Sequence, residues 1–111
     1  MPTRRRGGRS STDEATREAF GRLLAIARPD TGQARSVASF ILAWWNADSL
    51  GGFDIADLFA VDRAIARDMS TVFAYIANRK QPEYPTHYQS EIEELIRLWR
   101  PEIWAKASEP T

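Results

Sequence analysis

The sequence predicts an all-α protein, a compact bundle of four to five helices preceded by a flexible basic N-terminal arm. Helix-capping patterns recur along the chain, apolar residues return at helical spacing, and strand-type alternation is almost absent. With 111 residues, of which 43% are hydrophobic, the chain is long enough for one domain with a buried core. We divide it into a disordered basic arm over 1–11, a helical domain over 12–106 and a disordered tail over 107–111.

The arm, MPTRRRGGRSS, combines four arginines and two glycines with no apolar anchor. The arginines are Arg4, Arg5, Arg6 and Arg9. Because the net charge is zero, residues 12–111 carry 0 − 4 = −4. Such a body is a poor nucleic-acid surface, whereas the arm itself suits contact with DNA phosphates.

Two capping boxes predict the first two helices. Ser11 followed by Glu14 opens a helix that Pro29 ends, and Asp30 followed by Gln33 opens a helix over about 31–47. The second helix is apolar around more than half of its circumference. We therefore expect it to be the central helix of the bundle.

The segment WWNADSLGGFD, residues 44–54, is interpreted as a corner between two helices. Gly51 and Gly52 supply turn angles that other residues resist, and Asp54 is a suitable N-cap for a short helix over 54–60. A second helix is predicted over 62–79. A break near Ala60 to Val61 lets Asp62 cap that helix, since the alternative buries an unpaired carboxylate.

The end of the chain carries one further long helix. Thr86 followed by Gln89 is a third capping box, and Trp99 closes the apolar stripe that follows it. Pro101 ends or kinks this helix, and EIWAK adds one more turn.

The same corner superficially resembles a calcium-binding loop. Asn46, Asp48, Asp54 and Asp57 occupy ligand positions of a twelve-residue helix–loop–helix. Leu50, however, offers no side-chain oxygen, and Asp57 stands where calcium prefers a bidentate Glu. We therefore predict no metal site here.

Composition excludes several classes of function. The chain has no cysteine, which removes disulfides, thiolate zinc sites and cysteine nucleophiles. His87, the only histidine, is expected to be an exposed helix-start residue. No apolar run reaches the length of a membrane span, and no secretory leader or phosphate loop is apparent. We predict a cytoplasmic protein with no catalytic residue and no cofactor.

Protein–protein contact is the predicted function. It requires an exposed apolar patch, and Trp45, Leu98 and Trp104 are the candidate residues. The identity of the partner and the oligomeric state stay open.

Two other hypotheses stay in view. Residues 54–71 fit a helix-turn-helix that binds DNA through helix 62–79, with Arg63, Arg67 and the arm arginines as contacts. A carboxylate enzyme predicts instead a cleft lined by Asp48, Asp54 and Asp57, with raised pKa values.

Three short runs, AWWNA, GGFD and LWRPE, carry a resemblance that extends over about residues 20–105. The chain resembles a small domain family of unknown function, found in proteobacteria and often encoded on plasmids and integrative elements. The resemblance implies an accessory role in a bacterial mobile element. It brings no activity, cofactor or site residue.

Overall fold

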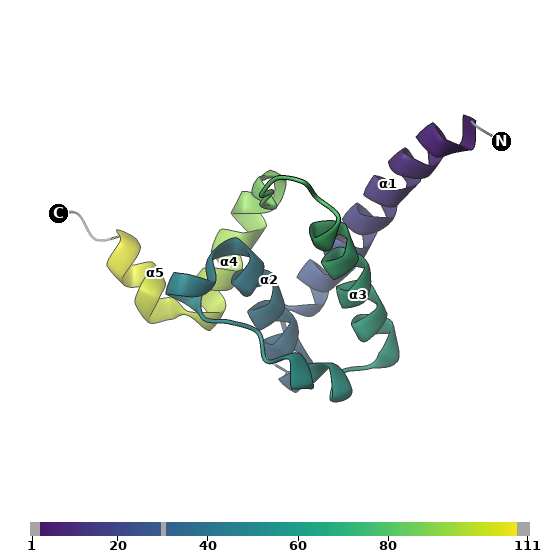
Figure 1. The fold of residues 1–111 in the computed structure, drawn as a ribbon. Helices are drawn as coiled ribbons and strands as arrows, with labels where there is room; N and C mark the ends of the chain where they lie inside the picture. Colours follow the sequence, from purple (N-terminus) through teal and green to yellow (C-terminus); the bar gives the residue numbers. More distant parts are fainter. Residues whose placement is uncertain (1–2, 30, 109–111) are drawn as a thin grey trace.

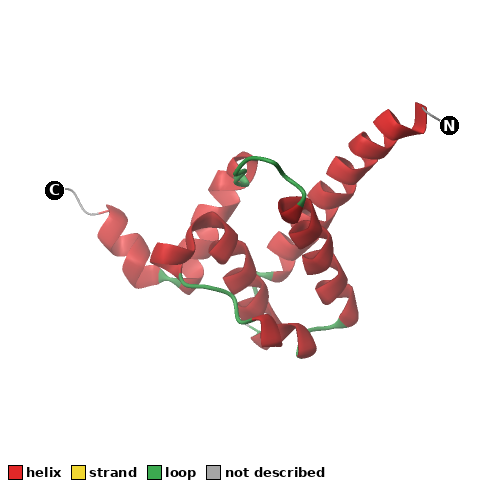
Figure 2. Cartoon of the chain, viewed as in Figure 1, coloured by secondary structure: helices red, strands yellow, loops and turns green. Residues whose placement is uncertain are grey.

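A computed structural model describes residues 3–29 and 31–108, with side chains for 14–29 and 31–107. Over these ranges the chain is helical without any strand, which confirms the all-α prediction (Figures 1 and 2). The elements are α1 (Thr3–Ile26), α2 (Gly32–Leu50), the 3₁₀ turn η1 (Ile55–Phe59), α3 (Arg63–Ala77), the 3₁₀ turn η2 (Thr86–Tyr88), α4 (Gln89–Trp99) and α5 (Pro101–Ser108).

Helix α1 begins at Thr3, eight residues before the predicted cap. The expected start at Ser11 is therefore wrong, because the helical backbone passes through this residue without a break. The N-terminal turns project beyond the other helices (Figure 1). The side chains of the four arm arginines lie outside the described residues, as do residues 109–111 of the predicted tail. A disordered arm and a disordered tail stay predictions.

Helix α2 is capped by Thr31, whose Oγ1 accepts a hydrogen bond from the backbone N of Ala34 at 3.0 Å. The predicted cap, Asp30, lies outside the described residues. The helix runs to Leu50, beyond its predicted end, and is kinked at Asn46. The Asn46 Oδ1 accepts from the backbone N of Ser49 at 3.2 Å and so starts the last turn anew.

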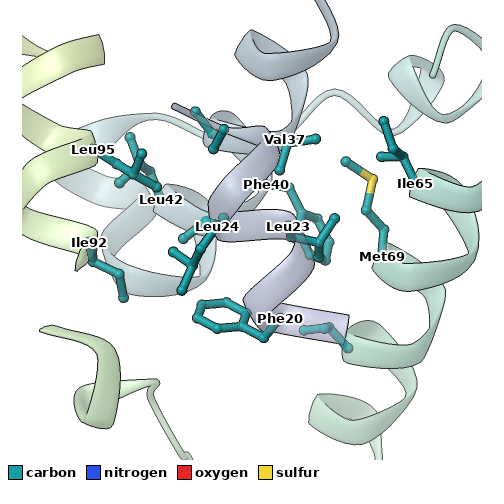
Figure 3. Packing of buried hydrophobic residues seen from close by; sticks show 14 of the residues in the cluster. Phe20, Leu23, Leu24, Val37, Phe40, Leu42, Ile65, Met69, Ile92 and Leu95 are labelled. Carbon is teal, nitrogen blue, oxygen red and sulfur yellow. The ribbon is translucent and has the colours of Figure 1, made fainter. Parts of the chain in front are cut away.

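The core forms where α1 and α2 cross. Val37, Ile41 and Leu42 of α2 are fully buried, which confirms the prediction of a central helix. Helix α2 packs on α4 and α1, while α3 packs chiefly on α1. Figure 3 shows the consequence: side chains of α4 and of α3 enter the core from opposite sides of the α1–α2 pair.

The predicted break between two helices near Ala60 is confirmed, but the first helix is a 3₁₀ turn and not an α-helix. Asp62 is exposed and occupies the N-cap position of α3 without a side-chain bond to that helix. Its partner is Gln33 of α2, whose Oε1 accepts from the Asp62 backbone N at 2.6 Å.

The predicted cap at Thr86 is wrong. Residues 86–88 form η2, and α4 begins only at Gln89 with no side-chain cap. Pro101 does separate two helices, as expected, and α5 is longer than the single turn predicted. Among the described residues, no helix combines the length and the apolar character that crossing a membrane requires.

Candidate functional site

An apolar groove of about 600 Å³ opens between α2, η1 and α3. Its lining is hydrophobic apart from two polar side chains. It consists of Phe40, Ala43, Trp44, Phe53, Ile55, Leu58, Arg63, Ala66, Met69, Ser70, Phe73 and Ile76. Apolar concave surfaces of this size are the usual place where a protein binds a ligand.

The groove exists because α3 is apolar on two adjoining faces. Ile65, Met69 and Val72 are buried, and Figure 3 shows Ile65 and Met69 directed toward the core. Successive helical residues point about 100° apart, so Phe73 is turned from Val72 toward one flank of the stripe, on the side of Met69. The Phe73 side chain is 59% exposed and forms part of the groove wall.

The other wall is set by η1. The Asp54 carboxylate accepts a hydrogen bond from the Ala56 backbone N at 3.0 Å, which confirms Asp54 as the N-cap. A 3₁₀ turn has three residues per turn, so Ile55 and Leu58 share one face, and both line the groove. Phe59 lies a third of a turn away from Leu58, where its side chain is 89% exposed.

Arg63, a predicted DNA contact, is exposed and donates hydrogen bonds to the backbone. Its Nη2 donates to the carbonyl oxygens of Leu58 at 2.7 Å and of Val61 at 2.8 Å, tying η1 to the start of α3. The second predicted contact on this helix, Arg67, is exposed. Both helix arginines are therefore exposed, and two backbone bonds hold the guanidinium of Arg63 at the η1 corner.

Asp68, on the outward side of the proposed DNA-reading helix, pairs with Arg22 of α1. The two hydrogen bonds from the Arg22 guanidinium are both 2.9 Å long. These bonds, together with the negative charge of Asp68, raise the pKa of Arg22 above its ordinary value. The pair fixes α3 on α1, so Asp68 also has a structural role.

Two carboxylates of the 44–57 corner, those of Asp54 and Asp57, accept hydrogen bonds within the protein. Besides the Asp54 cap, the Asp57 Oδ2 accepts from the Ser36 Oγ at 3.2 Å, and Asp48 is exposed. Across the described side chains, no cluster of three or more Asp, Glu or His residues is arranged to share an ion. Gly51 turns the chain with φ = 97°, a conformation that favours glycine, whereas Gly52 has no positive φ.

The three predicted interface residues are placed on three different helices. Leu98 of α4 is 52% exposed, Trp45 of α2 is half-buried against the core, and Trp104 of α5 is half-buried. The guanidinium of Arg97 lies 5.3 Å from the centre of the Trp104 ring. A partner contact at these residues stays a prediction.

Two further hollows adjoin the loop before η2. One, of about 620 Å³, is formed by one stretch of α2 over 43–48 together with Tyr84 and Thr86, and so has little enclosing wall. The other, of about 450 Å³, lies between α1, Trp44 and the loop and includes Glu83 and His87. Glu83 is already bonded to the Tyr75 hydroxyl at 2.6 Å and to Arg79 at 3.1 Å. Neither hollow offers an apolar surface comparable to the groove.

Sequence reasoning missed Ile55, Phe59 and Phe73 as surface residues. The signal for Phe73 was the pair Val72–Phe73, because two adjacent apolar residues widen the stripe beyond what one neighbouring helix covers. Phe59 carried no such signal, since its exposure depends on η1 being a 3₁₀ turn.

The residues that carry the family resemblance have structural roles. The indole N of Trp44 donates to the Glu83 carbonyl at 2.9 Å, and that of Trp99 donates to the Ala27 carbonyl at 2.8 Å. The Arg100 Nε donates to the Leu50 carbonyl at 2.8 Å. These bonds join distant parts of the chain and explain why the motifs identify a fold without identifying an activity.

Comparison with known proteins likewise identifies a family without identifying an activity. The model of a family of unknown function (DUF7673) matches residues 17–100. No curated protein and no solved structure matches the chain.

Proposed function

The chain belongs to the DUF7673 family, whose function is unknown, and we propose that it is a non-enzymatic protein-interaction module. In this proposal the groove between α2, η1 and α3 receives an apolar surface of a protein partner. The observation that carries the proposal is the exposure of Ile55 (67%) and Phe73 (59%) on the walls of an apolar groove.

Covering the exposed side chains of the groove with a partner is energetically favourable. Covering a large apolar side chain stabilises a complex by roughly 1.5–3 kcal/mol when the burial is complete. Contiguous apolar patches of more than a few hundred Å² are uncommon on a soluble monomer and mark interaction sites. Because Phe40 and Met69 form a buried apolar floor beneath these walls, a partner side chain in the groove is surrounded on several sides.

The setting of this function rests on the sequence. We propose an accessory role in a bacterial mobile element, following the resemblance, and a location in the cytoplasm, where a sequence without cysteine is at home. The partner is a protein that presents an apolar surface to the groove.

Site-specific photo-crosslinking tests the groove directly. Benzoylphenylalanine replaces Phe73 in the groove, Leu98 on α4 or Tyr84 beside the η2 loop, three positions that are all more than half exposed. We expect a discrete protein adduct in cells from the Phe73 position. Adducts at Leu98 alone place the interface on α4 and overturn the proposal, and Tyr84 gives the background of an unrelated exposed aromatic.

A further inference from the structure

We propose that the groove is occupied by a second copy of this chain, with Phe59 of each protomer inserted into the groove of the other. This inference rests on the proposed function and names its partner. Phe59 is the most exposed of the large apolar side chains described, at 89%. It belongs to the same short turn as Ile55 and Leu58, which line the groove.

This adjacency suits a two-fold interface. In such an interface the same patch serves both subunits, so each protomer must carry the protruding group and the receiving surface side by side. The η1 turn meets this condition, because its Ile55–Leu58 face closes the groove while Phe59 projects beside it. A two-fold axis near η1 exchanges the two Phe59 rings.

The exposed area agrees with what a stable dimer needs. Phe59, Phe73 and Ile55 are each more than half exposed, and together they present on the order of 400 Å² of apolar surface. A standard interface buries about 800 Å² per partner, of which about 56–65% is apolar. These three residues therefore supply most of the apolar centre of one such interface.

The charges around the groove favour a partner whose own surface also mixes acidic and basic side chains. Asp54 and Asp62 are exposed, each next in sequence to a residue of the groove lining, and Arg63 is itself part of that lining. A rim of mixed sign does not select a strongly acidic or strongly basic protein. A second copy brings the same acidic and basic groups in reverse order, and the net charge of zero leaves little repulsion between copies.

Sedimentation velocity of the full chain is the first test. Over about 1–300 µM we expect a concentration-dependent shift from 12.6 kDa to twice that mass. Phe59→Asp is expected to weaken the dimer at least ~100-fold, because two buried rings are lost for each dimer. Leu98→Asp, on α4, is the matched control and is expected to leave the dimer unchanged. Circular dichroism confirms that each variant is folded.

Directed disulfide formation locates the interface. The chain has no cysteine, so single-cysteine variants report one position each. A mixture of Ala60→Cys, beside Phe59, and Ser70→Cys, on the groove wall, is expected to form mixed disulfide dimers on mild oxidation. Ala105→Cys, exposed on α5, replaces Ala60→Cys in the control. If the control pair forms as much mixed disulfide dimer as the test pair, Phe59 does not lie in the groove of the other protomer.

The outcomes separate this inference from the proposed function. A chain that stays monomeric at all concentrations, while the Phe73 position crosslinks to a different protein, overturns the second copy and keeps the interaction module. A monomer without any Phe73 adduct overturns both. The inference is also overturned if Leu98→Asp dissociates the dimer while Phe59→Asp leaves it intact.

Discussion

The side-chain amide of Gln33 binds Asp62 across 29 residues of sequence. Its Oε1 accepts from the Asp62 backbone N at 2.6 Å, and its Nε2 donates to the Asp62 Oδ2 at 3.4 Å. Helix α3 thus takes the partner for its N-terminal end from the first turn of α2, and not from its own side chains. The groove wall formed by α3 therefore depends on Gln33, a residue of α2, which forms the opposite wall.

We expect Gln33→Ala to lower the free energy of unfolding by about 1 kcal/mol, since the Asp62 N–H loses its partner at a helix start. Urea denaturation monitored by circular dichroism measures this change. Gln89→Ala removes only an exposed bond to Glu93 and is expected to cost less than about 0.5 kcal/mol. Equal losses in the two variants contradict the prediction.

Gly51→Ala is predicted to destabilise the protein by about 1–3 kcal/mol. The backbone of Gly51, with φ = 97° and ψ = 157°, lies in a region that is essentially restricted to glycine. The nearest atom to an added Cβ is 3.8 Å away, on Arg100, so the cost comes from the backbone and not from a clash.

Gly52→Ala is the matched control for this change. An added Cβ meets nothing within 4 Å there, and the φ of Gly52 is not positive. We expect its midpoint of urea denaturation to stay at or above that of the wild type. A larger loss at Gly52 than at Gly51 refutes the assignment of the turn to Gly51.

Trp99→Phe is expected to cost about 1–2 kcal/mol, because the Ala27 carbonyl loses the indole N–H that bonds it at 2.8 Å. Ala27 is fully buried, so water does not readily replace this donor. Trp104→Phe makes the same chemical change at a half-buried position of α5 and is expected to cost less. Thermal melts of the two variants, measured side by side, decide the order.

Arg63→Ala is predicted to loosen the corner between η1 and α3 and to cost about 1 kcal/mol, since two carbonyl oxygens lose a charged donor. Arg67→Ala, exposed one turn later, is expected to stay within about 0.5 kcal/mol of the wild type. Urea titration of both variants checks the difference. Equal stability of the two variants means that the Arg63 bonds contribute nothing in solution.

DNA binding supplies a separate prediction. We expect Arg67→Glu to leave any DNA affinity unchanged, because Asp62 and the paired Asp68 keep this face of α3 from being strongly basic. Fluorescence anisotropy at low and physiological salt measures it, with a chain lacking residues 1–10 for comparison. Salt-sensitive binding that is lost in both variants instead favours the helix-turn-helix hypothesis.

Local signals predicted most of the helices. Pro29 and Pro101 mark helix boundaries, Asp54 is the cap that its position indicates, and the apolar circumference of α2 identifies the central helix. These features act within a few residues or on one helix. These features can therefore be predicted from the sequence alone.

Features that depend on distant partners were not predictable in the same way. Ser11 and Thr86 have the residues of a capping box, yet the backbone continues as a helix at the first and forms a 3₁₀ turn at the second. The role of Gln33 requires α2 and α3 to be placed first. The groove likewise appears only when α3 packs on α1 and leaves Phe73 uncovered, since the sequence does not state which helix covers which face.

The attachment of α3 has a mechanical consequence. This helix packs chiefly on α1, while α2 packs on α1 and α4, so the two walls of the groove rest on different neighbours and are bonded to each other through Gln33 and Asp62. We expect a small tilt of α3 to change the width of the groove. Amide hydrogen exchange of α3, compared with that of α2, measures how readily this wall opens.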